Sequence, residues 1–66
     1  MKPILIQLET LEGGTFWVDC TKITTIAELE KSSEIVGSVI YLEKEVRFWS
    51  GTSMEDVVQR IEEKTK

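Results

Sequence analysis

The side chains best suited to binding another molecule are two tryptophans, an arginine and a tyrosine. The chain has 66 residues, and Arg47 stands two positions before Trp49, while Trp17 lies far from both. Trp and Arg are enriched where protein surfaces dock. They also stack on planar ligands, and Arg can pair with a phosphate or carboxylate. Together with Tyr41, which would add apolar surface, they are the candidate binding residues.

Three roles stay open for Trp17 and Trp49. In the strands predicted below, each tryptophan lies on the face opposite to the neighbouring residues expected to form the core. The indoles therefore belong to a second buried layer, to a subunit interface, or to a site where a ligand stacks.

The residue types on which most enzymes depend are scarce. Without histidine the chain has no imidazole base or metal ligand. Its single cysteine, Cys20, cannot form an intrachain disulfide and is predicted to be a small buried apolar group. Glu43 and Glu45 flank a turn and are interpreted as solvated carboxylates rather than a divalent-ion site. We predict no enzymatic activity, no cofactor and no metal.

Charge and hydropathy argue against two classes of partner. The net charge of −4 opposes binding to a nucleic-acid backbone or an anionic membrane surface. No stretch approaches the roughly 20 apolar residues of a membrane span. The apolar run near the start is too short for a signal peptide. A lone cysteine is typical of a reducing compartment, so the sequence predicts a cytoplasmic protein.

The length predicts one small domain over residues 1–66 that needs help to be stable. A domain of about 60 residues buries only about 60% of the surface of its unfolded chain. Small folds usually add disulfides, metals or association. Because neither a disulfide nor a metal site is predicted, association with other chains is the remaining way to stabilise the fold.

Alternating apolar residues predict a series of strands. The strands are expected at residues 3–11, 15–20, 23–29, 36–43 and 46–50. Gly13 and Gly14 supply a tight hairpin turn between the first two. Residues 23–29 also fit a helical period, and a bulge would explain the imperfect alternation. Residues 30–34 are predicted to be an exposed, mobile loop.

A helix is predicted after Ser50. Thr52 with Glu55 fits a capping box, and Ser53 is a competing N-cap. Asp56 and Arg60 are four apart and predict a supporting ion pair. The expected buried stripe follows helical spacing and consists of Met54, Val57, Val58 and Ile61.

These elements predict an α+β fold: a curved antiparallel sheet of about five strands followed by one C-terminal helix, in the order β-β-β-β-β-α. Its strands are apolar on both faces, as where Phe16 and Val18 point one way and Trp17 points the other. A strand that is apolar on both faces needs apolar side chains packed against each face, and one short chain has few residues left to cover the second face.

The pattern resembles the small FlbD-type proteins associated with bacterial flagella and swarming. The matching segments lie in order over most of the chain: 4–8, 15–18, 23–26, 38–42 and 53–58. The family tends to have Asn-Gly turns, where this chain has Gly13-Gly14 and Glu43-Lys44. The resemblance implies a compact, non-enzymatic regulator or adaptor, is equally compatible with a small phage-encoded protein, and carries over no functional residue.

Two functions follow as hypotheses. The first is a non-catalytic interaction module that binds itself, as a homo-oligomer, and a protein partner through its second apolar face and an exposed strand edge. The second is a homo-oligomeric binder that holds a nucleotide-like molecule between Trp17, Arg47 and Trp49 at a subunit interface.

Overall fold

The computed structural model describes residues 2–66, which form five antiparallel strands and a C-terminal helix. The elements are β1 (Leu5–Glu9), β2 (Thr15–Asp19), β3 (Ile23–Lys31), β4 (Glu34–Leu42), β5 (Arg47–Ser50) and α1 (Met54–Thr65). The α+β class and the element order are therefore confirmed. The strands are divided between two sheets, β1-β2 and β3-β4-β5, a division that the apolar pattern did not predict.

The β1-β2 hairpin forms where the glycine pair predicts it. Gly13 has a φ of 95°, a left-handed conformation that glycine adopts without strain. Thr10 closes the turn, because its backbone N–H donates to the Gly14 carbonyl at 2.9 Å and its Oγ1 accepts from the Gly14 N–H at 2.9 Å. The resulting register places Gln7 opposite Trp17.

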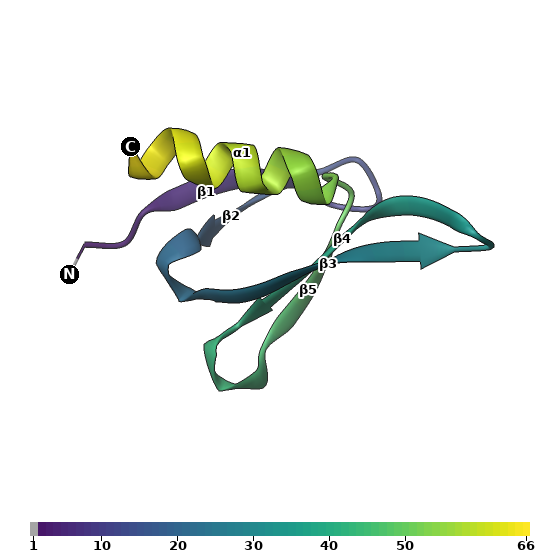
Figure 1. Cartoon of the computed structure of the whole chain (residues 1–66), viewed down its shortest axis with the longest axis horizontal. Coiled ribbons are helices and arrows are strands. Elements are labelled where there is room, and N and C mark those ends of the chain that lie inside the picture. Colours follow the sequence, from purple (N-terminus) through teal and green to yellow (C-terminus); the bar gives the residue numbers. More distant parts are fainter. Residues whose placement is uncertain (1) are drawn as a thin grey trace.

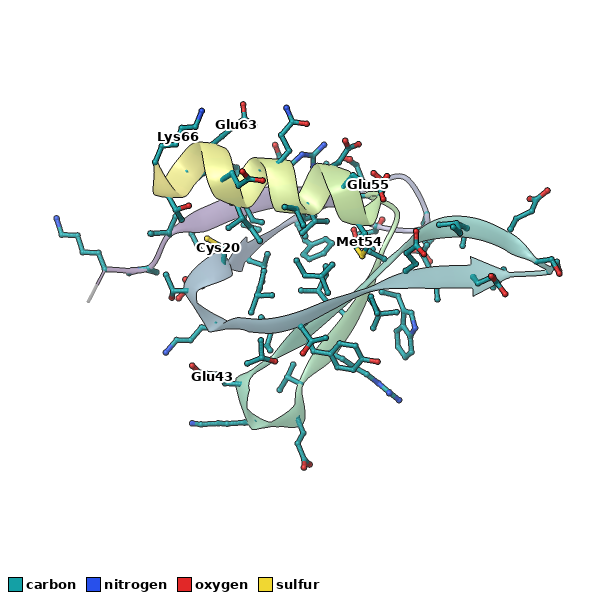
Figure 2. The ribbon with its side chains drawn as sticks, in the orientation of Figure 1. Cys20, Glu43, Met54, Glu55, Glu63 and Lys66 are labelled. Atoms are coloured by element: carbon teal, nitrogen blue, oxygen red, sulfur yellow. The ribbon has the colours of Figure 1, made fainter. Side chains whose placement is uncertain are left out.

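A short 3-10 turn over Cys20–Lys22 carries the chain from the first sheet to the second. Asp19 holds it, since its Oδ1 accepts from the Thr21 N–H at 3.0 Å and from the Ile4 N–H at 3.2 Å. Cys20 is buried, as predicted, and lies beneath α1 in Figure 2. Burial raises the pKa of its thiol, which is typical of an unreactive structural cysteine.

The segment 30–34 is exposed, as predicted, but most of it is strand and not loop. β3 continues to Lys31 and β4 begins at Glu34, so only Ser32 and Ser33 connect them. Both serines have positive φ, 51° and 66°, as in the two-residue turns whose twist matches a hairpin. Residues 23–29 are a strand, and a register shift between Ile23 and Thr25 lets Ile23 and Ile26, three residues apart, both pack against the core.

The β4-β5 hairpin sets the register of the candidate binding residues. Lys44 and Glu45 turn the chain with φ values of 65° and 64°, and the Leu42 N–H donates to the Val46 carbonyl at 2.7 Å. Tyr41 then lies opposite Arg47, and residue 39 lies opposite Trp49.

The core lies between α1 and the inner faces of both sheets. Its buried residues are Ile6, Leu8, Val18, Cys20, Ile40 and Val57. Figure 1 shows α1 running along β1, while the β3-β4 hairpin extends past the start of the helix. The helix buries Val57 fully, but Val58, predicted for the same stripe, remains 41% exposed.

Ser53, and not Thr52, caps the helix. Its Oγ accepts from the Asp56 N–H at 3.2 Å. Thr52 is buried instead and bonds to β1, so the capping-box interpretation is wrong. The predicted Asp56–Arg60 pair is also replaced, because Arg60 reaches across to Glu9.

Candidate functional site

The structure brings Arg47 and Trp49 together on β5. The guanidinium carbon of Arg47 lies 5.5 Å from the centroid of the Trp49 ring, within the range of a cation–π contact. The indole is nonetheless 52% exposed. Trp49 is therefore not part of the buried core, and the exposed part of its side chain is available to another molecule.

Tyr41 and Val39 extend this surface onto β4. Tyr41 lies opposite Arg47 and is half-buried, and Val39 lies opposite Trp49. Val39 is buried although it does not belong to the core cluster. Since residues directly opposed across two strands share a face, Val39, Tyr41 and Trp49 form an apolar layer on the outer face of the sheet, with the Arg47 guanidinium beside it.

Val46 and Phe48, expected to face the core, stay largely exposed. Phe48 lies on the same face as Ile40 and its ring centroid is 6.0 Å from that of Phe16. Even so, 41% of Phe48 and 45% of Val46 remain accessible. The placement on the inner face is right, but the core does not close over this end of β5.

Trp17 lies on the other sheet and does not join this group. It projects from β2 with 59% of its surface exposed, and it lines a hollow different from the one beside Trp49. The 3-10 turn after β2 moves the chain to the second sheet, so strand faces that look equivalent in the sequence belong to different surfaces. Within one chain, Trp17 is thus separated from Arg47 and Trp49.

β5 presents an edge with unpaired backbone groups. Within residues 2–66, the sheet order leaves β5 with β4 as its only ladder partner. The Val46 carbonyl points to β4, and the Gly51 N–H points away from it, to the Glu9 carbonyl at 2.8 Å. Because consecutive residues of an antiparallel strand alternate in direction, the backbone groups of Arg47 and Trp49 also point away from β4. We call these groups the β5 edge.

Open space lies along the β5 edge. A hollow of about 340 Å³ is lined by Leu11, Glu12, Arg47, Phe48 and Trp49. Leu11, in the β1-β2 turn, is itself 41% exposed. A strand edge bordered by aromatic and aliphatic side chains is suited to adding a further strand.

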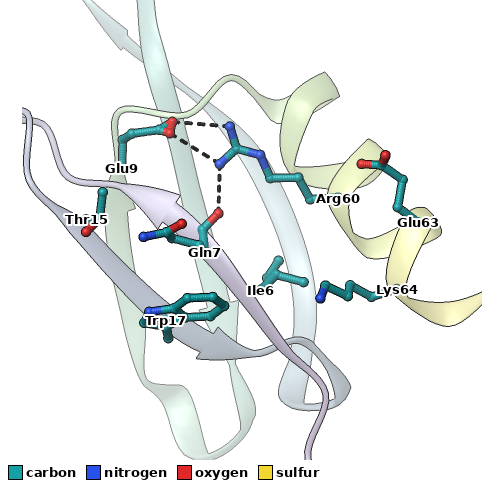
Figure 3. Close-up of a pocket in the computed structure, with 8 residues that line it drawn as sticks. All are labelled: Ile6, Gln7, Glu9, Thr15, Trp17, Arg60, Glu63 and Lys64. Atoms are coloured by element: carbon teal, nitrogen blue, oxygen red, sulfur yellow. Dashed lines mark hydrogen bonds and ion pairs between the residues drawn. The ribbon is translucent and has the colours of Figure 1, made fainter.

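The second hollow, about 510 Å³, lies between the outer face of the β1-β2 hairpin and α1 (Figure 3). We call it the Trp17 hollow; its lining residues are Ile6, Gln7, Glu9, Thr15, Trp17, Arg60, Glu63 and Lys64. It combines an exposed indole with the cations of Arg60 and Lys64. The sequence reasoning missed both cations, because nothing in helical spacing shows which strand a helix edge will meet.

Glu9 joins the two sheets and the helix through a polar cluster. Its Oε2 lies 3.2 Å from the Arg60 Nη1, which also donates to the Gln7 carbonyl at 2.7 Å. Its backbone N–H donates to the Thr52 Oγ1 at 2.9 Å, and its carbonyl accepts from the Ser50 Oγ at 2.8 Å. These contacts tie β1 to the chain between β5 and α1.

We expect Glu9 to make the fold acid-sensitive. The hydrogen bond from Arg60, and a further one from Thr52, lower the pKa of the Glu9 carboxyl below its ordinary value of 4.5, although partial burial opposes them. A lowered folded-state pKa stabilises the protein above about pH 4.5, and this contribution is lost as the pH falls through the folded-state pKa.

The contribution of the Glu9 carboxylate can be measured as the change in the free energy of unfolding, determined with urea, between pH 6.5 and about pH 3. Glu9→Gln should lose less stability on acidification than the wild type. Glu12→Gln, at an exposed carboxylate in the adjoining turn, is the matched control and should respond as the wild type does. Equal losses in all three proteins would contradict the role of Glu9.

In the described part of the chain no helix is long and apolar enough to cross a membrane. Comparison with known proteins found no matching family model, curated protein or solved structure. The FlbD-type resemblance therefore stays a prediction.

Proposed function

We propose that this protein is a non-catalytic interaction module that acts as a homo-oligomer through β5. The observation that carries the proposal is the combination, on one strand, of an unpaired backbone edge with the exposed rings of Phe48 and Trp49. A lone chain would leave both the polar groups and the aromatic surface to water. Association with a second copy would satisfy the first and bury the second.

The rest of the surface supports this choice. Large apolar side chains are exposed on nearly every element of the described structure: Leu5, Leu11, Trp17, Ile35, Val36, Val46, Phe48, Trp49 and Val58. Scattered exposed apolar groups are normal, but contiguous ones mark interaction sites. On β5 and the facing turn they are contiguous, because Leu11, Phe48 and Trp49 line one hollow.

Light scattering coupled to size-exclusion chromatography tests the proposal. The wild type should have a mass greater than that of one chain at micromolar concentration. Trp49→Ala should weaken self-association by at least about 30-fold, since truncating one central interface tryptophan typically costs about 2 kcal/mol and each copy loses one. Trp17→Ala removes an equally exposed indole from the other sheet and should leave the mass unchanged.

The proposal fails if the wild type has the mass of one chain over the whole accessible concentration range. Circular dichroism of both variants shows that any change in mass is not the result of unfolding.

A second candidate function is favoured by the Trp17 hollow. Arg60 is engaged by Glu9 and by the Gln7 carbonyl, whereas Lys64 makes no ion pair with any other residue in 2–66. An indole with a nearby available ammonium group suits a planar anion such as a nucleotide. Within one chain Trp17 lies apart from Arg47 and Trp49, so this candidate site combines Trp17 with Lys64.

Fluorescence titration separates this candidate from the first. In a Trp49→Phe background Trp17 is the sole tryptophan, and saturable quenching of tryptophan emission by a nucleotide would report binding. Lys64→Ala should weaken it at least tenfold, whereas Lys66→Ala, two residues further along, should not. The absence of quenching by any nucleotide at millimolar concentration would remove the candidate.

A further inference from the structure

We infer that two copies of the chain pair antiparallel through β5, with Phe48 directly opposite Phe48 of the second copy. This inference rests on the proposed function and adds the geometry of the interface. It follows from which backbone groups of β5 are available and from the charge and conformation of the residues around them.

The direction of the backbone groups restricts the possible registers. At the β5 edge the outward-pointing residues are Arg47 and Trp49, followed by Gly51. A two-fold symmetric antiparallel pair must set outward-pointing residues opposite one another, or no hydrogen bonds form between the copies. The symmetry axis must therefore pass through a residue and not between two residues.

Four of the five registers with an axis at residues 46–50 meet an obstacle. An axis at Val46 needs Glu45 to be extended, but Glu45 has a φ of 64°. An axis at Arg47 sets two guanidinium groups against each other, which is unfavourable across strands. An axis at Trp49 or at Ser50 pairs Gly51 with Arg47 or Trp49 of the second copy, but the Gly51 N–H already donates to Glu9.

An axis at Phe48 needs neither Glu45 nor Gly51 for a hydrogen bond and sets no like charges against each other. It places Arg47 of each copy opposite Trp49 of the other, so both exchange backbone hydrogen bonds. On the outer face the guanidinium of one copy then lies beside the indole of the other, the same pairing that Arg47 and Trp49 make within one chain at 5.5 Å. On the inner face the two Phe48 rings meet at a non-hydrogen-bonded position, where side chains approach most closely.

The surface is therefore self-complementary in this register. The two three-stranded sheets become one continuous sheet across the dimer. The exposed fractions of Phe48 (41%) and Trp49 (52%) are the surfaces that the second copy would cover. The occupant of the β5 edge is accordingly a second β5.

Disulfide trapping tests the register. Directly opposed Cα atoms are about 4.5 Å apart at a non-hydrogen-bonded pair and about 5.5 Å apart at a hydrogen-bonded pair, and both fit a disulfide. Under mild oxidation Phe48→Cys should form covalent dimers at least tenfold faster than either Arg47→Cys or Trp49→Cys alone. The wild type is the control, because its Cys20 is buried.

A mixed experiment keeps the test independent of how Phe48→Cys folds. An equal mixture of Arg47→Cys and Trp49→Cys chains should form the mixed dimer in clear excess over either self-dimer. Faster self-linking of Arg47→Cys, or of Trp49→Cys, would overturn the inference in favour of an axis at that residue. No preference among the variants would also overturn it.

The mass of the wild type distinguishes a failure of the register from a failure of the proposed function. If the wild type is larger than one chain and the trapping pattern is different, the register is wrong and the proposed function stands. If the wild type is a single chain, both fail.

Discussion

Replacing Gly37 with alanine is expected to destabilise the fold by about 3 kcal/mol or more, a large part of the stability of a domain this small. An added Cβ would lie against the Ser50 carbonyl oxygen, 3.0 Å from the Ser50 carbonyl carbon and 3.1 Å from the Gly51 Cα. All three are backbone atoms, so they cannot rotate away. Relief would require β4 and the end of β5 to separate.

Urea denaturation followed by circular dichroism measures this loss as a lower midpoint. Gly14→Ala is the matched control. Its Cβ would meet only the Thr10 hydroxyl, at 3.3 Å, and that side chain can move. Its cost should stay below about 1 kcal/mol. Equal midpoints for Gly37→Ala and Gly14→Ala would show that the approach of β4 to Ser50 is looser than described.

Replacing Arg47 with proline is expected to abolish self-association, whereas Arg47→Ala should only weaken it. Both changes remove the guanidinium and its contact with Trp49, which at an exposed site is worth about 0.5–1 kcal/mol, or a few-fold in affinity. Proline also removes the outward-pointing N–H and fills its place with a ring. The edge then has no donor at this position and no room for a partner strand.

The single chain should tolerate the proline. The Arg47 N–H points away from β4, so the β4-β5 ladder loses nothing, and proline is accepted on edge strands. Val46, with φ −83° and ψ 138°, already has the extended conformation that a residue before proline requires. The difference in dissociation constant between Arg47→Pro and Arg47→Ala therefore measures the contribution of the backbone at the β5 edge.

Analytical ultracentrifugation over a dilution series measures both dissociation constants. We expect Arg47→Pro to dissociate at least about 100-fold more readily than the wild type, because each dimer would lose two hydrogen bonds of about 1 kcal/mol and gain a clash. Equal dissociation constants for Arg47→Pro and Arg47→Ala would show that copies associate without using the β5 edge.

Features that depend on neighbouring residues could be predicted from the sequence. The alternation of Ile6 and Leu8 with Gln7 puts both apolar side chains on one face of the expected strand, and the structure buries both. The glycine pair predicted the first hairpin, because a left-handed residue is needed there and glycine adopts it readily. The second hairpin escaped prediction, because serines, which do not favour positive φ, occupy its turn.

The candidate site depended on contacts between distant residues and could be predicted only in part. Arg47 and Trp49 are two apart on one strand, so strand geometry alone put them on one face. The pairing of Glu9 with Arg60 joins residues 51 positions apart, and no local pattern favours it over the i, i+4 pair with Asp56. The same holds for Thr52, whose capping pattern is valid but whose hydroxyl bonds to β1 instead.

The amino-acid order by itself determined the α+β class, the succession of strands and helix, and the excess of apolar surface, because these follow from periodicity and composition over short stretches. Only the tertiary structure decided that Trp17 and Trp49 lie on separate surfaces and that β5 has an open edge. The physical reason is that a turn of three residues, Cys20–Lys22, transfers the chain from one sheet to the other. The strand pairing that follows depends on hydrogen bonds between residues far apart in the chain, and side-chain alternation does not encode them.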